Sequence, residues 1–319
     1  MSRYRQQPIE FTALKTVPIA DRGGKVRIEH FGRVPRKGMT AGEFLDGLPS
    51  ILAADSLRGI ISALRMAKQS GRAILWGLGG HVIKCGLAPT LIHLMDSGYV
   101  SGLVLNGAAS IHDFEIGIAG CTSEDVEAVL PDGRFGAAEE TGREMNEAIV
   151  AGAAKGLGMG EALGACLDEI ADPRFAAHCL VLQAWRRSIP VTVHVAVGTD
   201  TPHTHPAAQG DAIGASTHQD FRLLCSVVRE LHQGGVYLNV GSAVVLPEVF
   251  LKAVSVVRNL GYPLAEFTTV NLDFLQHYRP KMNVVDRPHA KAGGRGFSLT
   301  GHHEIMLPLI AAILADGEA

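Results

Sequence analysis

The chain has 319 residues, of which 47% are hydrophobic and 19% charged, enough for one large α/β domain with a full core. Its formal net charge of −3 argues against a nucleic-acid-binding protein, and no apolar run approaches the roughly 20 residues that a membrane span requires. The five cysteines form no C-x-x-C pair and the first residues lack an apolar signal core, so we expect a cytoplasmic protein with reduced thiols.

We expect an N-terminal arm over residues 1–38, which lack hydrophobic periodicity, and a single α/β domain over 39–319. The domain opens with Thr40 and Glu43, whose three-residue spacing is that of a helix-capping box. Helices are predicted over 41–52, 56–70, 82–97, 141–157, 159–170, 173–185, 221–231 and 247–259, and strands over 73–76, 103–105, 189–195, 236–240 and 266–270. Because strands alternate with helices, the sequence predicts a mainly parallel sheet covered by helices on both faces.

Small residues follow the first two predicted strands where each strand ends. Gly77, Gly79 and Gly80 come after the first strand, and Asn106 and Gly107 come after the second. Small residues in such positions let backbone N–H groups approach a ligand at the carboxyl edge of a parallel sheet. The sequence therefore predicts a binding cleft at that edge, although the same glycines can also serve only to make the turn into the next helix.

Histidines supply candidate groups for proton transfer. His112 and Asp113 can form an acid/base pair or a set of metal ligands, or they can cap a helix. His302 lies just before the last predicted helix, where helix capping is again the alternative. Imidazole is the side chain whose unperturbed pKa, about 6.5, suits acid/base work at neutral pH. We therefore interpret His112 and His302 as catalytic candidates, with Asp113 as the partner of His112.

A further group of histidines follows the predicted strand at 189–195. His203 and His205 are two residues apart in a loop bounded by prolines, and the nearest possible further ligands are Asp200, Asp211 and His218. An H-x-H pair can chelate a divalent metal only with further ligands, so a metal site is the weaker alternative here. We interpret the loop as a polar active-site lid in which His203, His205 and Asp211 are catalytic, and we expect the histidines to share one cleft.

Five motifs occur along the chain in a characteristic order and spacing. They are Gly80-His81-x-Ile83-Lys84-x-Gly86, the Gly-Asp-centred loop at 209–214, the glycine-rich strand end at 240–245, the strand and acidic turn at 268–273, and the closing helix that includes 305–310. Together they resemble the deoxyhypusine synthase family, in its bacterial synthase-like branch.

The resemblance implies a Rossmann-like, NAD-binding fold and a homotetramer that transfers an alkyl or aminobutyl group from a polyamine. It also implies a set of cofactor-binding residues, namely Gly77, Gly79, Gly80, His81, Asn106, Gly107, Gly241, Asn271 and Asp273. At the turn before the last helix, His302 stands where the family has an acidic residue that contacts the cofactor.

The chain also departs from the family at its catalytic centre. The family's Trp-Gly-Lys motif, which holds the lysine that forms an imine with the substrate, is absent, although Lys281 and Lys291 lie in that part of the sequence. We therefore expect an NAD-linked enzyme that acts on a polyamine or another amine-bearing small molecule without a protein-lysine acceptor. The alternatives are a different enzyme with a His-rich cleft, which can bind a metal, and a non-catalytic nucleotide-binding module.

Overall fold

A computed structural model describes residues 3–317 of the chain. Its centre is a sheet of six parallel strands in the order β3-β2-β1-β4-β5-β6. The strands are β1 (Ile74–Leu78), β2 (Gly102–Asn106), β3 (Val191–His194), β4 (Val236–Val240), β5 (Thr268–Asp273) and β6 (Arg295–Thr300). This is the strand order of a doubly wound Rossmann-type sheet, whose direction of winding reverses between β1 and β4. The predicted α/β class is confirmed.

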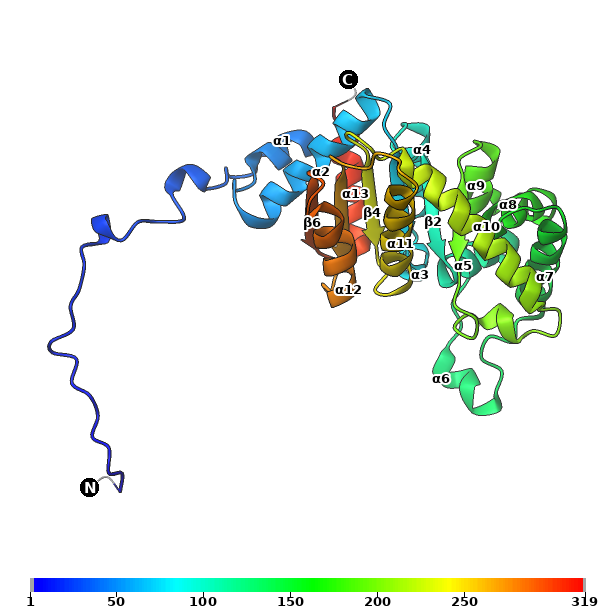
Figure 1. Cartoon of the computed structure of the whole chain (residues 1–319), viewed down its shortest axis with the longest axis horizontal. Helices are drawn as coiled ribbons and strands as arrows, with labels where there is room; N and C mark the ends of the chain where they lie inside the picture. The colour runs from blue at the N-terminus through cyan, green and yellow to red at the C-terminus, as the bar shows by residue number, and fades with distance from the viewer. Residues whose placement is uncertain (1–2, 318–319) are drawn as a thin grey trace.

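Helices cover both faces of the sheet (Figure 1). They are α1 (Ala41–Gly47), α2 (Leu52–Gln69), α3 (Gly80–Lys84), α4 (Ala88–Asp96), α5 (Gly107–Ala119), α6 (Val126–Val129), α7 (Glu139–Ala154), α8 (Met159–Ile170), α9 (Leu180–Arg186), α10 (Gly210–Arg229), α11 (Val245–Asn259), α12 (Tyr278–Pro280) and α13 (His303–Ala315). Short 3-10 turns and one π-helical turn join them. None of these helices, within residues 3–317, is both long enough and apolar enough to cross a membrane.

Alternation along the strands divides the core into two layers. In β1, Ile74, Trp76 and Leu78 pack into the larger cluster, which includes α2, α4 and α13. Leu75 points to the opposite face and joins the smaller cluster, where Tyr237 of β4 belongs among side chains of α10 and α11. All five residues of β1 are buried, as expected for a central parallel strand with helices on both sides.

The parallel register brings the carboxyl ends of the strands to one edge of the sheet. Leu78 of β1 pairs with Leu105 of β2 and with Val240 of β4, and Val240 pairs in turn with Leu272 of β5. The prediction that the loops after these strands open on the same edge is confirmed. The predicted capping box is also present, because Thr40 Oγ1 accepts from the Glu43 amide at 3.2 Å and Glu43 Oε2 accepts from the Thr40 amide at 3.1 Å.

Several predicted helices have other bounds in the structure: the helix expected over 41–52 ends at Gly47, that over 173–185 begins at Leu180, and that over 221–231 begins at Gly210. Two further differences have local reasons. The helix expected over 82–97 is two helices, α3 and α4, because Gly86 adopts a left-handed φ of +73° and Pro89 favours the first turn of a new helix, which begins at Ala88. The strand expected to end at residue 76 continues to Leu78, so Gly77 lies inside β1 rather than in the loop after it.

One strand, β6 (Arg295–Thr300), has no counterpart in the prediction. It lies at the edge of the sheet beside β5, and five of its six residues are half-buried or exposed. Such a strand lacks the continuous apolar run by which buried parallel strands are recognised in a sequence.

Residues 3–39 form an extended arm that runs away from the sheet (Figure 1). Two short 3-10 turns, Ile19–Asp21 and Ile28–His30, are its regular elements. The arm exposes large apolar side chains, among them Ile9 at 82%, Phe11 at 76% and Ile19 at 82% of their surface. Exposed apolar side chains at this density are typical of a surface that packs on another chain.

Candidate active-site cavity

A cavity of about 940 Å³ lies beyond the β1, β2 and β3 ends of the sheet. Its walls come from α5, from the start of α7 and from the loop after β3, and the segment around α6 covers it. It is lined by Lys84, Ala108, Ile111, His112, Glu115, Ile118, Ala119, Cys121, Thr122, Ser123, Glu124, Val126, Phe135, Ala138, Glu140, Thr141, Glu144, Ile170, Thr199, Asp200 and Thr201. A volume at the upper end of the range for small-molecule sites leaves room for a substrate.

The charge of the lining is strongly one-sided. Five carboxylates line the cavity, and Lys84 is the one lysine or arginine among the lining residues. Glu144 is neutralised in part by Arg143, whose Nη1 lies 2.8 Å from its Oε1. The excess of carboxylates attracts cations and repels anions, since low-dielectric walls strengthen the field inside a cavity.

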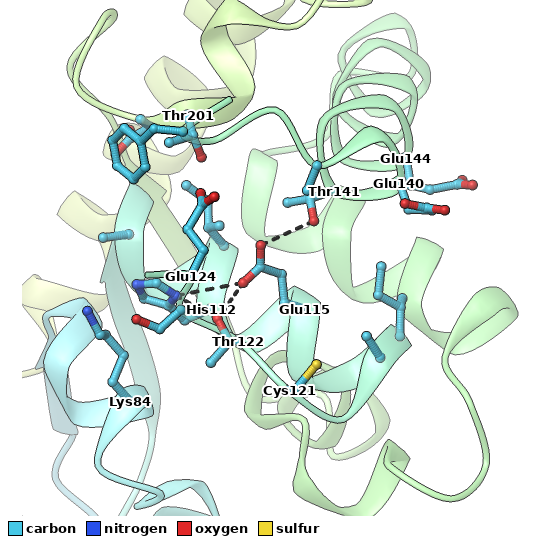
Figure 2. Close-up of a pocket in the computed structure, with 18 of the residues that line it drawn as sticks. Lys84, His112, Glu115, Cys121, Thr122, Glu124, Glu140, Thr141, Glu144 and Thr201 are labelled. Carbon is cyan, nitrogen blue, oxygen red and sulfur yellow. Dashed lines mark hydrogen bonds and ion pairs between the residues drawn. The ribbon is translucent and has the colours of Figure 1, made fainter. Parts of the chain in front are cut away.

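Four side chains at the centre of the cavity are linked by hydrogen bonds (Figure 2). His112 Nδ1 lies 2.7 Å from Thr122 Oγ1, and Thr122 Oγ1 donates to Glu115 Oε2. Thr141 Oγ1 holds the other carboxylate oxygen of Glu115, Oε1, at 3.2 Å. His112 and Glu115 come from adjacent turns of α5. Thr122 and Thr141 lie after the end of α5, so the tertiary fold brings them to these two residues.

The hydrogen-bond pattern assigns the tautomer of His112. Thr122 has one hydroxyl hydrogen, which it donates to Glu115, so its oxygen accepts from His112 and Nδ1 of the imidazole carries the hydrogen. In the neutral ring, Nε2 is then the free acceptor. Figure 2 shows the His112 ring on the side of the cavity where Lys84 lies. His112 is thus arranged as a proton acceptor.

Glu115 is suited to stabilise a proton on His112. Burial raises the pKa of Glu115, but the nearby His112 imidazole and the hydrogen bonds from Thr122 and Thr141 outweigh that effect, so its pKa lies below the ordinary value. Its carboxylate is therefore charged at neutral pH, and Oε2 lies 3.9 Å from His112 Nδ1. A carboxylate that is linked to an imidazole favours the imidazolium form.

Asp200 places a second carboxylate at the N-terminal end of α5. A Cβ on Gly107, the first residue of this helix, would overlap the Asp200 carboxylate, so the two are packed in contact. Burial raises the pKa of Asp200. Its Oδ2 atom is buried and has no hydrogen-bond partner among residues 3–317, and a buried acceptor left unpaired costs about 1–3 kcal/mol. This oxygen is shielded from solvent, so Asp200 acts on the contents of the cavity through its charge.

Protein atoms lie close beside the glycines that are predicted to contact a cofactor. A Cβ on Gly79 would overlap the carbonyl oxygen of Gly241, and one on Gly77 would lie 2.5 Å from the Tyr237 hydroxyl. A Cβ on Gly80 would lie 2.9 Å from that of Ala108 in α5. The missing side chains are therefore explained by the close approach of strands and helices, without a ligand.

Gly241 and His81, which are also predicted to contact the cofactor, lie after the carboxyl ends of β4 and β1. Gly241 adopts a left-handed φ of +70° and packs under His303, whose Cε1 would lie 2.9 Å from an added Cβ. His81 is exposed, and its ring lies edge-on to that of Phe274 at a centroid distance of 5.8 Å. The space above the β1–β4 switch point is thus filled by His303 and its neighbours.

The three polar residues predicted for the cofactor have protein partners. Asn106 caps α5, since its Oδ1 accepts from the Ala109 amide at 2.9 Å. Asn271 is buried inside β5 and accepts from Asn239 Nδ2 at 2.7 Å. Asp273 ends β5, where its Oδ1 accepts from the amide of the next residue at 2.8 Å. The residues present therefore do not form an open dinucleotide cradle in this arrangement.

The carboxylates predicted to be catalytic lie outside the cavity lining. Asp113 is fully buried, and its two oxygens accept from the Leu180 and Val181 amides at 2.7 Å each, which caps α9. Burial raises the pKa of Asp113 to about 6. Asp211 is exposed in the first turn of α10. Asp113 thus has the capping role that was the alternative interpretation.

The structure does not gather the predicted histidines around one cavity. His112 lines the cavity, whereas the other three are absent from its lining. His203 Nδ1 accepts from the Gly198 amide at 3.3 Å, and His205 Nε2 lies 3.2 Å from Glu139 Oε2. His302 is 67% exposed and stacks on Phe274 at the other half of the edge. The expectation of a shared cleft is wrong for these three side chains.

Sequence reasoning missed Glu115 and Thr122 as site residues, and it named Asp200 only as a possible metal ligand. Glu115 is three residues after His112 in a helical segment, a spacing that places both on one face, and this signal was available. Thr122 and Asp200 lie in irregular segments, so only the path of the chain brings them to α5.

By sequence, no family model matches the chain and no curated protein is detectably similar to it. By structure, the chain is similar to a protein of Methanococcus maripaludis S2 assigned to the LOR/SDH class, with a TM-score of 0.52 and 14% identity over 90% of this chain and 74% of that one. It is also similar to AgrE in its ternary complex with ornithine and NAD+, with a TM-score of 0.52 and 15% identity over 82% of this chain and 33% of AgrE. A protein of Entamoeba histolytica assigned as a deoxyhypusine synthase aligns with a TM-score of 0.48 and 13% identity over 87% of this chain and 93% of that one.

These similarities establish the fold, which is the Rossmann-like α/β fold that the sequence predicts. At identities of 14–15% they do not establish an activity. The chain spans about a third of the length of AgrE. Membership of the deoxyhypusine synthase family stays a prediction.

Proposed function

We propose that the protein is an enzyme that binds an amine-bearing small molecule in the acidic cavity and uses His112 to accept a proton from it. The observation that carries the proposal is the lining itself, in which five carboxylates face a single lysine within about 940 Å³. A substrate with one or more ammonium groups matches this charge, and a substrate with phosphate or carboxylate groups does not. The polyamine class suggested by the sequence resemblance is one example of such a substrate.

The hydrogen-bonded chain on α5 suggests how the site works. A bound ammonium group transfers a proton to His112 Nε2, which leaves the nitrogen lone pair that amine chemistry requires. The resulting imidazolium is stabilised through Thr122 by the charged Glu115 carboxylate. The nearby Asp200 carboxylate adds to the attraction of the ammonium group through its charge.

An NAD-linked reaction is the finer part of the proposal. The strand order supports it, and so does the similarity to AgrE, which has been captured with ornithine and NAD+. The glycines do not support it, because protein atoms fill the space beside each of them. We therefore assign no step to the cofactor.

An assay with the purified chain tests both parts. Putrescine, spermidine and ornithine are added with and without NAD+, and the readouts are the melting temperature and the absorbance of NADH. We expect a diamine at about 100 times its dissociation constant to raise the melting temperature by about 5 °C. The diol and dicarboxylate of the same length, 1,4-butanediol and succinate, serve as controls and should leave it unchanged.

The outcomes separate the two parts. Stabilisation by amines without NADH formation would remove the NAD linkage and leave the amine site. Stabilisation by succinate, or by none of the three amines, would overturn the proposed function.

We also propose that the arm mediates the predicted homo-oligomer. Its exposed apolar side chains, such as Phe11 and Ile19, have no cover on the body of the same chain. Light scattering should give a mass greater than that of one chain, and Phe11→Ser with Ile19→Ser should lower it. A monomeric parent protein would refute this part.

A further inference from the structure

Three side chains with metal-binding atoms converge at the carboxyl edge of the sheet, outside the acidic cavity. His81 and Cys85 are four residues apart, at the start and just after the end of α3, so they project from the same side of the chain. Glu304 lies in the first turn of α13. The strands before these two helices, β1 and β6, are separated in the sheet by β4 and β5, so the fold rather than the local sequence brings the three together.

The distances between the ligand atoms are those of a metal site. Cys85 Sγ lies 3.3 Å from His81 Nε2 and 3.6 Å from Glu304 Oε2. All three ligand atoms lie within 4.8 Å of one another. A tetrahedral zinc ion with its usual bond lengths requires separations of about 3.5 Å between a nitrogen or oxygen ligand and a sulfur ligand. Both sulfur separations therefore already fit, and the third requires only a change of rotamer of Glu304, which is exposed.

The surroundings restrict the geometry of the group. Phe274 packs edge-on against His81 and stacks on His302. His302 Nδ1 lies 3.8 Å from Glu304 Oε1, so this imidazole is next to the group. His302 is thus a neighbour of Glu304, but it is not among the residues whose ligand atoms lie within 4.8 Å of one another.

We propose that His81, Cys85 and Glu304 form a binding site for a divalent cation of the zinc class, with the fourth position left to a water molecule. The combination of imidazole, thiolate and carboxylate suits zinc, because magnesium and calcium prefer sites made of oxygen ligands alone. On binding, the metal replaces the thiol hydrogen that Cys85 directs at Glu304, and one proton leaves to solvent. None of the three ligands lines the acidic cavity, so this site does not depend on the proposed function.

Cobalt(II) is the probe for the test, because it substitutes for zinc and absorbs light. The full chain is stripped with a chelator and titrated with cobalt, and zinc is then added in competition. We expect one equivalent of cobalt to produce a thiolate-to-cobalt charge-transfer band and the intense visible bands of a tetrahedral ion. Zinc should abolish both.

Variants identify the ligands. Cys85→Ser should abolish the charge-transfer band. His81→Ala should weaken cobalt binding by more than about 100-fold, since changes even in outer-shell partners cost about 10- to 100-fold. His81 is exposed, so its replacement tests the site without a large loss of packing. The matched control is Cys121→Ser, which removes an exposed thiol from the lining of the acidic cavity and should retain the band.

Three results would overturn the proposal. One is the absence of a charge-transfer band in the parent protein. The second is a band that persists in Cys85→Ser, and the third is a band that disappears in Cys121→Ser.

Discussion

The two halves of the sheet's carboxyl edge are built from the same kind of element but present different chemistry. Beyond β3, β2 and β1, the helices stand apart and enclose a large cavity lined by carboxylates. Beyond β4, β5 and β6, the edge is closed, because His303 packs on Gly241 with Phe274 beside it. At the surface of that half, His81, Cys85 and Glu304 bring an imidazole, a thiol and a carboxylate together.

The difference shows what glycines after strands can mean. Gly79 and Gly241 lie at the topological switch point, where open α/β sheets bind their ligands, yet here they contact each other. The open space lies one strand further along, where α5 presents His112 and Glu115. The position of a site therefore depends on which neighbouring helices leave a cavity between them, as well as on where the strands end.

The largest effect should follow from removing the proton acceptor of the cavity. His112→Asn keeps a hydrogen bond to Thr122 but cannot titrate, so we expect any amine-dependent activity to fall about 100- to 10,000-fold. The matched control is His218→Asn, an exposed histidine on α10 that should keep its activity. A loss of less than tenfold in His112→Asn would show that another group accepts the proton.

The closed half predicts a large effect on stability. A methyl group at Gly79 would overlap the Gly241 carbonyl oxygen, and backbone atoms cannot move aside as side chains do, so Gly79→Ala should lower the free energy of unfolding by about 3 kcal/mol. Gly214→Ala in α10, where the new methyl group meets nothing, should change it by less than about 1 kcal/mol. Urea unfolding measures both.

A stable Gly79→Ala protein would weaken the comparison. It would mean that the loops after β1 and β4 separate readily, and the glycine loops would again be a candidate cofactor site.

The pH dependence of amine binding should come from the open half. Burial raises the pKa of Asp200, so this carboxylate gains a proton at a higher pH than an ordinary aspartate as the pH falls. The pKa of Glu115 is lowered, so it keeps its charge over the same range. Amine affinity should therefore fall first through Asp200. Asp200→Asn should bind the amine about tenfold more weakly near neutral pH and lose that part of the pH dependence, as measured by titration at several pH values.

The smallest effect should distinguish the cavity charges from the general surface charge. Glu140 is an exposed member of the lining, so Glu140→Gln should weaken amine binding only about two- to fivefold. Glu161→Gln removes an equal charge from α8, outside that lining, and should leave the affinity unchanged. Equal losses in both variants would mean that net charge alone attracts the amine.

The elements that the sequence predicts well are those with a strong local signal. The strand at 236–240 matches β4 and the helix at 159–170 matches α8, because each is a continuous apolar or amphipathic segment with clear ends. β6 was missed because, as an exposed edge strand, it carries no such signal. The carboxyl edge itself was predictable, since parallel strands must end together.

The chemistry of the edge was less predictable because it depends on long-range packing. Asp113 and His112 are adjacent in sequence, yet one caps α9 in the core and the other faces the cavity. A helix turns by about 100° per residue, so neighbouring residues face different surroundings. Similarly, nothing local indicates that residues 81 and 304 meet, because β4 and β5 lie between the strands that precede them.

The most direct test of the central claim is a calorimetric titration of putrescine into the parent protein and into a Glu115→Gln, Asp200→Asn double variant. The account predicts one site in the parent protein and binding at least about tenfold weaker in the double variant, because two of the five carboxylates that line the cavity lose their charge. Circular dichroism establishes that the variant is folded. Equal binding of putrescine to both proteins, or no heat with the parent protein, would contradict the claim that the acidic cavity is an amine site.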